Sequence, residues 1–247
     1  MEVIRQHFEQ MGSTNTWAKL HAHQLPRDKI TLVTAGMQTA GRGRFNRKWE
    51  SPAHENIYAS FCFFIEKHRT DIGNIPQVLA LSAAEILKAL GFSPELKWPN
   101  DVLLSKKKVA GILAETTPLS DQLCMIIGIG LNVNMPLETL QKIDRPATSL
   151  ANESGRPFDV EKVLDRLQIQ FTKDLDLFFE EGFHPFFAPY CASMSQSLNQ
   201  VIQFHDNRTV WKGFFDGINH DGSLRLKLPE GEIKTFVAGE ILWPQKI

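Results

Sequence analysis

Residues 97–115 read KWPNDVLLSKKKVAGILAE, and this pattern predicts two β-strands joined by a tight, cationic turn. Apolar runs at 102–104 and 109–113 are separated by residues 105–107, which read Ser-Lys-Lys and supply the turn. Pro99 cannot donate a hydrogen bond to a neighbouring strand, so we expect the first strand to be kinked there or to begin after it. The two strands therefore form a hairpin whose turn carries the lysines.

Charged side chains stand where these strands enter and leave the turn, at Lys97, Asp101 and Lys108. A partly buried lysine beside an aspartate is a candidate for binding anions and handling protons. Gly111 has no side chain and would let a ligand approach the backbone closely. The simpler interpretation is an exposed lysine-rich hairpin that only keeps a sheet edge soluble.

Length and composition predict one large folded domain, or one domain with a small appendage, in a chain of 247 residues. Hydrophobic residues make up 43% and charged residues 22%, which is typical of a packed core. The formal net charge is −1, so no overall field draws the protein to nucleic acid or to an anionic membrane. Anion binding must therefore come from local clusters of cations.

The spacing of cysteine and histidine residues and the hydropathy of the chain narrow the class of protein further. Cys62, Cys124 and Cys191 are odd in number and far apart, so they predict neither a disulfide framework nor a thiolate zinc site. The histidines show no metal-binding spacing, and we assign no metal ligand to the chain. No run approaches the ~18 apolar residues of a membrane span, and no signal-peptide core is expected. These features predict a cytoplasmic protein.

A loop rich in glycine and arginine follows the strand predicted at 30–35. Residues 38–49 read QTAGRGRFNRKW, with cations at Arg42, Arg44, Arg47 and Lys48. Gly41 and Gly43 let the backbone wrap around an anion, and arginines bind phosphate or carboxylate through paired donors. Trp49 offers a face for a purine. The loop lacks the Lys-Ser/Thr pair of a Walker A motif, and an RNA-binding Arg-Gly segment or a solvated loop are the alternatives.

The same loop contains few apolar residues to stabilise it. Fixing roughly a dozen residues would cost ~10–20 kcal/mol of backbone entropy, which no burial within the loop offsets. We therefore expect the loop to be disordered without ligand and to close when anions arrive.

Ser13, Thr14 and Asn15 follow Gly12 and predict the cap of a helix that runs to about His23, with Trp17, Ala18 and Leu20 facing inward. Such a cap offers donors and the positive end of the helix dipole to a polar ligand, and plain capping is the simpler interpretation.

The remaining helices are predicted from Pro76 to about Leu90 and, capped by Asp159, from there to about Glu181. Prolines in His184-Pro185 and Ala188-Pro189 are expected to end the helical region. Short strands are predicted at 201–204, 210–215, 224–228 and 233–237, separated by turns. This pattern predicts a small barrel, with Trp211 and Trp243 in its core.

Motifs spaced along nearly the whole chain resemble the biotin–protein ligases, also called biotin–[acetyl-CoA-carboxylase] ligases. They are Ser13-Thr14-Asn15 (biotin-contacting cap), 41–49 (biotinyl-adenylate loop), 97–101, 108–113 and 128–134 (second to fourth signatures) and 237–241 (C-terminal motif). Phe45-Asn46 departs from the Arg-Gly common after the Gly-Arg-Gly-Arg run, a departure that bears on adenylate retention. With no helix-turn-helix ahead of these motifs, the resemblance is to the monofunctional type, and no repressor role or DNA partner is expected.

The resemblance implies an α+β fold: a mixed central sheet flanked by helices, as in class II synthetases and biotin ligases, with a C-terminal Src-homology-3-like barrel. We expect the catalytic domain to span 1–195 and the barrel 196–247. The implied reaction has two steps. The carboxylate of biotin attacks the α-phosphorus of ATP to give biotinyl-5′-AMP, and a lysine of the biotin carboxyl carrier protein of acetyl-CoA carboxylase then displaces AMP.

The resemblance also implies roles for individual residues. Lys108 would bridge carboxylate and phosphate while Arg42 and Arg44 close over it, and Asp101 would orient or deprotonate the incoming lysine. Trp49 and Asn132 are expected on the adenine side, and Ser13, Thr14 and Gln38 at the ureido ring. The other implied ligand-binding residues are Asn15, Gly41, Gly43, Lys97, Asn100, Gly111 and Gly130. Mg²⁺ is expected on phosphate oxygens and water rather than in a protein cage.

Two other functions are compatible with parts of the chain. A lipoate–protein ligase shares the two-step logic, although the Gly-Arg-Gly-Arg run and the barrel favour biotin. A non-enzymatic nucleotide- or RNA-binding module would use the arginine loop but gives Lys108 no role. No membrane partner is expected. Both a monomer and a homodimer are compatible with the sequence, because an exposed sheet edge can pair with a carrier or with a second copy.

Overall fold

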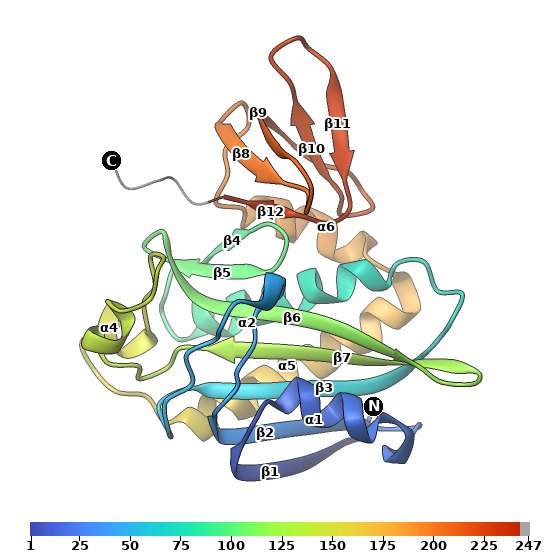
Figure 1. The fold of residues 1–247 in the computed structure, drawn as a ribbon, viewed down its shortest axis with the longest axis vertical. Helices are drawn as coiled ribbons and strands as arrows, with labels where there is room; N and C mark the ends of the chain where they lie inside the picture. The colour runs from blue at the N-terminus through green and yellow to red at the C-terminus, as the bar shows by residue number, and fades with distance from the viewer. Residues whose placement is uncertain (243–247) are drawn as a thin grey trace.

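A computed structural model describes residues 1–242 of the chain, and its framework is two β-sheets, one of seven strands and one of five (Figure 1). The large sheet consists, in spatial order, of β1 (Val3–Met11), β2 (Ile30–Gln38), β3 (Ile57–Glu66), β7 (Gln122–Leu131), β6 (Lys107–Pro118), β5 (Asp101–Leu104) and β4 (Glu95–Lys97). Strands β1 and β2 are parallel and the other pairs are antiparallel, so the sheet is mixed. The predicted α+β class is confirmed.

Helices cover both faces of this sheet. Helix α1 (Thr14–His21) lies on one face, and α2 (Ile75–Ala89) and α5 (Val160–Glu181) cover the other (Figure 1). Strand residues alternate between the faces: Cys62 contributes to the small core under α1, whereas its neighbour Phe61 contributes to the main core. The face opposite α1 therefore contains most of the buried apolar side chains.

Ser13 and Asp159 cap α1 and α5 as predicted, each accepting a hydrogen bond from the third residue that follows it. Of the α1 residues expected to face inward, Ala18 is buried, but Leu20 is 67% exposed and was placed wrongly. Ala18 faces the sheet, and a residue two positions further along a helix lies about 200° around its axis, so Leu20 points outward.

The prolines near residue 185 do not end the helical region, so that prediction is wrong. A further helix, α6, spans His184–Ala192 and includes Pro189. Pro185 occupies its first turn, where an amide hydrogen has no partner within the helix and its loss has little effect. Two short helices, α3 (Leu137–Leu140) and α4 (Leu150–Ser154), follow β7.

The predicted C-terminal strands form a five-stranded antiparallel sheet. It consists, in spatial order, of β11 (Ile233–Phe236), β10 (Leu224–Lys227), β9 (Val210–Ile218), β8 (Val201–His205) and β12 (Glu240–Ile241). Phe204 and Phe215 are buried in its core, whereas Trp211 is only partly buried against Phe236. Trp243, the other expected core tryptophan, lies outside the described residues.

The turn between β9 and β10 is one of the places where the C-terminal sheet contacts the large-sheet part of the chain. The carbonyl of Gly222 accepts hydrogen bonds from Gln77 Nε2 and Trp98 Nε1, both at 2.9 Å. Asn74 Nδ2 donates to the neighbouring carbonyl of Asp221 at 2.8 Å. Lys97 of β4 donates to the carbonyl of Ile241, so β12 lies beside β4 and β5, next to the β5–β6 hairpin of the large sheet (Figure 1). Across residues 1–242, no helix combines the length and apolar character needed to span a bilayer.

Candidate active site

An open cleft of about 1140 Å³, its mouth included, lies where the cationic loop, the β5–β6 hairpin and β12 meet. Every ligand-binding residue predicted from the sequence lines this cleft except Gly41. Those that line it are Ser13, Thr14, Asn15, Gln38, Arg42, Gly43, Arg44, Trp49, Lys97, Asn100, Asp101, Lys108, Gly111, Gly130 and Asn132. Gly41 is instead buried behind it, where a Cβ would meet Trp49 O at 2.6 Å and Ser51 Oγ at 2.7 Å.

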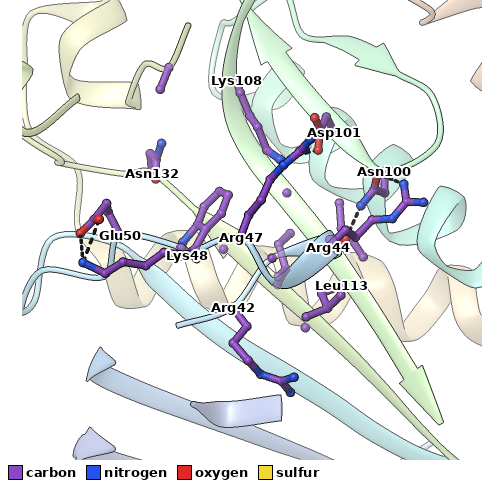
Figure 2. Close-up of a pocket in the computed structure, with 18 of the residues that line it drawn as sticks. Arg42, Arg44, Arg47, Lys48, Glu50, Asn100, Asp101, Lys108, Leu113 and Asn132 are labelled. Atoms are coloured by element: carbon purple, nitrogen blue, oxygen red, sulfur yellow. Dashed lines mark hydrogen bonds and ion pairs between the residues drawn. The ribbon is translucent and has the colours of Figure 1, made fainter. Parts of the chain in front are cut away.

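Lys108 and Asp101 point toward one another across the hairpin and form an ion pair of 2.5 Å between Nζ and Oδ1 (Figure 2). Both side chains are largely buried, at 14% and 11% exposure. Burial raises the pKa of Asp101, but the nearby charges of Lys108 and Lys97 together outweigh it and lower the pKa below its usual value. Asp101 is therefore a stable anion that fixes the ammonium of Lys108 at the cleft wall.

Lys97 is the second cation beside Asp101, and it is almost fully buried at 3% exposure. Its Nζ donates to the carbonyl of Ile241 on β12. Burial lowers the pKa of Lys97 to about 8, although the charges of Asp101 and Glu240 oppose the shift. Lys97 thus links the Lys108–Asp101 pair to the C-terminal sheet.

Paired glycines make room for the side chains on the cleft floor. Gly111 and Gly130 face each other across β6 and β7. A Cβ at Gly111 would meet Lys108 Nζ at 2.7 Å, and one at Gly130 would fall on the ring of Trp49. The space above Gly111, predicted to admit a ligand, is therefore occupied by Lys108 and Trp49. Lys108 Nζ also lies 5.3 Å from the centroid of the Trp49 ring.

Two buried polar atoms at this floor have no hydrogen-bond partner within residues 1–242, namely Trp49 Nε1 and Asn132 Oδ1. Asn132 Nδ2 donates to Thr148 O at 3.0 Å, which fixes the amide and turns Oδ1 into an available acceptor. A buried donor and a buried acceptor left unpaired carry a free-energy penalty that a ligand can relieve.

The helix cap forms a polar network at the other end of the cleft. Gln38 Oε1 accepts from Thr14 N at 2.9 Å and from Thr14 Oγ1 at 3.2 Å, and Gln38 Nε2 donates to Ser51 Oγ at 3.1 Å. Ser60 Oγ donates to Asn15 Oδ1 at 2.5 Å. Ser51, which lies outside the strands, and Ser60 of β3 carried no signal in the sequence, because a single serine forms no recognisable motif.

Three arginines of the loop are anchored on three different segments of the chain. Arg42 binds Glu115 of β6, Arg44 Nη1 donates to Asn100 Oδ1 at 3.3 Å, and Arg47 binds Glu240 of β12. Burial lowers the pKa of Arg44, against the opposing charges of Glu240 and Asp101. These contacts outside the loop oppose its loss of backbone entropy, and ligand-dependent ordering stays a prediction.

Arg42 does not close over Lys108 in this structure: Figure 2 shows its side chain directed away from the Lys108–Asp101 pair. Phe45 adopts a left-handed conformation with φ of 58°, which is strained for a bulky residue. The guanidinium carbons of Arg44 and Arg47 lie 5.0 and 5.4 Å from the centroid of its ring. The departure at Phe45 therefore adds an aromatic ring that both cations contact.

Several site residues were missed by the sequence reasoning. Arg145 lines the cleft from the segment after α3, and Glu240 lines it from the C-terminal sheet. Glu240 stands in the motif at 237–241, so its position was noticed although its role was not. Glu115 closes the quoted hairpin stretch but does not line the cleft. Only the folded chain brings these residues to one place.

Comparisons with known proteins identify the family of the chain. Residues 7–132 match the Biotin/lipoate A/B protein ligase family, and residues 197–242 match the Biotin protein ligase C terminal domain. The bifunctional ligase/repressor BirA of Bacillus subtilis is 31% identical over 96% of this chain and 74% of its own length. The biotin–[acetyl-CoA-carboxylase] ligase of Paracoccus denitrificans is 31% identical over 85% of this chain and 89% of its own.

Among solved structures, the biotin protein ligase of Aquifex aeolicus in complex with biotin and ATP superposes with a TM-score of 0.80. It is 30% identical in sequence, and the match covers 98% of this chain and 97% of that one. The match therefore includes both the seven-stranded sheet and the C-terminal sheet. With one family model matched over residues 7–132 and the C-terminal domain model over 197–242, the chain belongs to the Biotin/lipoate A/B protein ligase family.

Proposed function

We propose that this protein is a biotin–protein ligase, which uses ATP to form biotinyl-5′-AMP and transfers biotin to a lysine of a biotin carboxyl carrier protein. The carrier proposed is that of acetyl-CoA carboxylase, in line with the name of the Paracoccus denitrificans relative. The observation that carries the proposal is the placement of Lys108, held by Asp101, between a polar helix cap and a cationic loop.

The first step joins two anions, so a fixed cation between them is its main requirement. An oxygen of the biotin carboxylate forms a bond to the α-phosphorus of ATP, while the bond from that phosphorus to the bridging oxygen breaks and pyrophosphate leaves. Two unit charges 4 Å apart repel by about 4 kcal/mol at an effective dielectric near 20. Lys108 offsets this repulsion, and a barrier reduction of that size corresponds to about a thousandfold in rate.

In the second step the amine of the carrier lysine attacks the acyl carbon, the acyl–phosphate oxygen bond breaks, and AMP leaves. The amine must lose a proton, and Asp101 was one candidate to accept it. The lowered pKa of Asp101 and its ion pair with Lys108 make it a weak base. We therefore assign Asp101 the orienting role, which it exerts through Lys108, and the proton of the amine passes to solvent water.

Ligand recognition follows from the unpaired and preorganised groups. Asn132 Oδ1 is placed to accept from an amine on a purine edge, and Trp49 provides the adjacent ring. Thr14 and Gln38 present paired donors and acceptors suited to the ureido ring of biotin, which needs them when buried. The two ends of the cleft thus suit the two ends of biotinyl-5′-AMP.

Mg²⁺ belongs to the proposal as the counterion of ATP, where it would neutralise phosphate charge. The carboxylates of Asp101 and Glu240 are already paired with Lys108 and Arg47. They are therefore engaged elsewhere, which fits a metal held by phosphate oxygens and water instead of by protein carboxylates. We also propose the division into 1–195 and 196–247, which the match at 197–242 supports. We also propose a cytoplasmic location, which the free state of the three cysteines supports. The protein is proposed to be a monomer or a homodimer.

Pyrophosphate release tests the proposal directly. Purified protein is incubated with ATP, Mg²⁺ and either biotin or lipoate, and we expect release only with biotin. The family match covers both biotin and lipoate ligases, but the C-terminal match at 197–242 is to biotin protein ligases. Release with lipoate alone would assign the rival activity, and release with neither acid would refute the proposal.

A further inference from the structure

Glu115, on β6 outside the cleft, gathers three side chains from two other segments. Its carboxylate accepts from Asn15 Nδ2 at 3.1 Å and from Arg42 Nη2 at 3.0 Å, and Lys19 Nζ lies 3.5 Å away. Burial raises the pKa of Glu115, but the Asn15 hydrogen bond and the charges of Arg42 and Lys19 together lower it. Glu115 is therefore an anion at neutral pH.

Asn15, in the first turn of α1, holds the carboxylate of Glu115 in place. Its Oδ1 accepts from Ser60 Oγ, and its Nδ2 also donates to Leu113 O at 3.1 Å. A Cβ on Gly128 would collide with the Asn15 side chain, so the strand below it is shaped around this residue. Glu115 thus stands on a rigid base, whereas Arg42 belongs to a loop and is 40% exposed.

We propose that Glu115 is a positioning residue that holds Arg42, and with it the loop at 41–49, over the cleft and so slows the escape of the acyl-adenylate. The inference rests on the proposed function, because it concerns retention of that intermediate. The backbone of Arg42 forms an antiparallel β-bridge with that of Lys48, and Trp49 N donates to Gly41 O at 2.9 Å. An anchor at Arg42 consequently restrains both ends of the loop, residues 41–42 and 48–49.

The same contacts argue against two simpler roles. Glu115 does not line the cleft, so it is not placed to touch a substrate. It is also not an isolated surface anion, since only 17% of its side chain is exposed and three donors converge on it. Because ion pairs with an exposed partner are individually weak, the expected effects are several-fold rather than orders of magnitude.

The first test uses the protein without ligand. Glu115→Gln keeps the shape of the side chain and its bond with Asn15 but removes the charge that holds Arg42. We expect trypsin to cleave after Arg42 and Arg44 about three- to tenfold faster in this variant. Asp121→Asn is the matched control, because it breaks an arginine–carboxylate pair with Arg27 on an exposed surface away from the cleft. Equal cleavage of Glu115→Gln and wild type would overturn the proposed contact.

The second test measures retention. Labelled biotin and ATP are loaded onto the protein, free ligand is removed, and loss of labelled adenylate is followed during a chase. We expect release to be about three- to tenfold faster in Glu115→Gln, with the first turnover of pyrophosphate within about twofold of wild type. Glu115→Asp, which keeps the charge, should restore slow release in part.

A double-variant cycle separates positioning from a general structural effect. If Glu115 acts through Arg42, the pair Glu115→Gln with Arg42→Ala should release adenylate no faster than Arg42→Ala alone. Multiplying effects, or unchanged release in Glu115→Gln, would overturn the inference. If the wild-type protein forms no adenylate, the proposed function fails instead, while the trypsin result still decides whether Glu115 restrains the loop.

Discussion

Arg47 and Glu240, 193 positions apart in the chain, form the ion pair that joins the cationic loop to the C-terminal sheet. Arg47 Nη1 donates to both carboxylate oxygens of Glu240, at 2.6 and 2.7 Å. The glutamate is largely buried, at 11% side-chain exposure, whereas the arginine is 38% exposed. The C-terminal sheet therefore supplies a carboxylate to the cleft and takes part in shaping its loop.

We expect Arg47→Ala to reduce the free energy of unfolding by about 1 kcal/mol, because it leaves the carboxylate of Glu240 buried without its partner. The exposure of Arg47 keeps the value below that of a fully buried pair. Lys48→Ala is the control, since its partner Glu50 is itself exposed, and it should change stability by less than ~0.5 kcal/mol. Denaturant titration measures both, and equal losses in the two variants would contradict the prediction.

Lys108→Ala should abolish formation of biotinyl-5′-AMP while the fold is retained. Loss of the cation between two anions predicts a fall in rate of about a thousandfold or more. Biotin-dependent pyrophosphate release measures this. Lys107→Ala is the control, because Lys107 is exposed on the same hairpin and its ion pair with Glu153 is long at 3.9 Å. Near-normal turnover of Lys108→Ala would defeat the assignment.

Gly130→Ala should displace Trp49, because a Cβ at residue 130 falls on the tryptophan ring. We expect the KM for ATP to rise about tenfold, with a change in intrinsic fluorescence on ATP binding that is smaller than in wild type. Gly73→Ala is the matched control, since nothing lies within 4 Å of its added methyl group. An unchanged KM in Gly130→Ala would show that Trp49 does not contact the nucleotide.

Lys97 predicts a specific dependence of stability on pH. Burial lowers its pKa from 10.5 to about 8, so between these values the unfolded chain binds a proton that the folded protein does not. The free energy of unfolding should therefore rise with pH across this window, by at most about 3 kcal/mol. Relative to Lys97→Met, which has no such group, the wild-type protein should gain stability from pH 8 to 10. Parallel curves for the two proteins would exclude a depressed pKa.

The loop should be protected by ligands. Biotin together with ATP is expected to slow tryptic cleavage after Arg42 and Arg44 at least several-fold, because bound anions hold the cations that the protease must reach. Cleavage of a site far from the cleft, such as Arg208, serves as the internal reference. Equal cleavage of the loop with and without ligand would refute closure.

Sequence reasoning succeeded where spacing alone sets geometry. Asp101 and Lys108 meet because both belong to one short hairpin, and Ser13 caps α1 because a cap acts on the residues directly after it. It failed at Leu20 and at Pro189, where burial and helix continuation depend on what packs against the segment. Local pattern does not record those neighbours.

The sequence by itself determined the cationic loop, the hairpin lysines, the two kinds of sheet and the family, because these depend on residue type and on order along the chain. Only the tertiary structure decided which carboxylate each loop arginine meets, Glu115 for Arg42 and Glu240 for Arg47. It also set Gly111 opposite Gly130, so that Trp49 and Lys108 fit above them. Ion-pair partners and steric clearances are fixed by distances through space, and distant segments acquire those distances only when the sheets and helices pack.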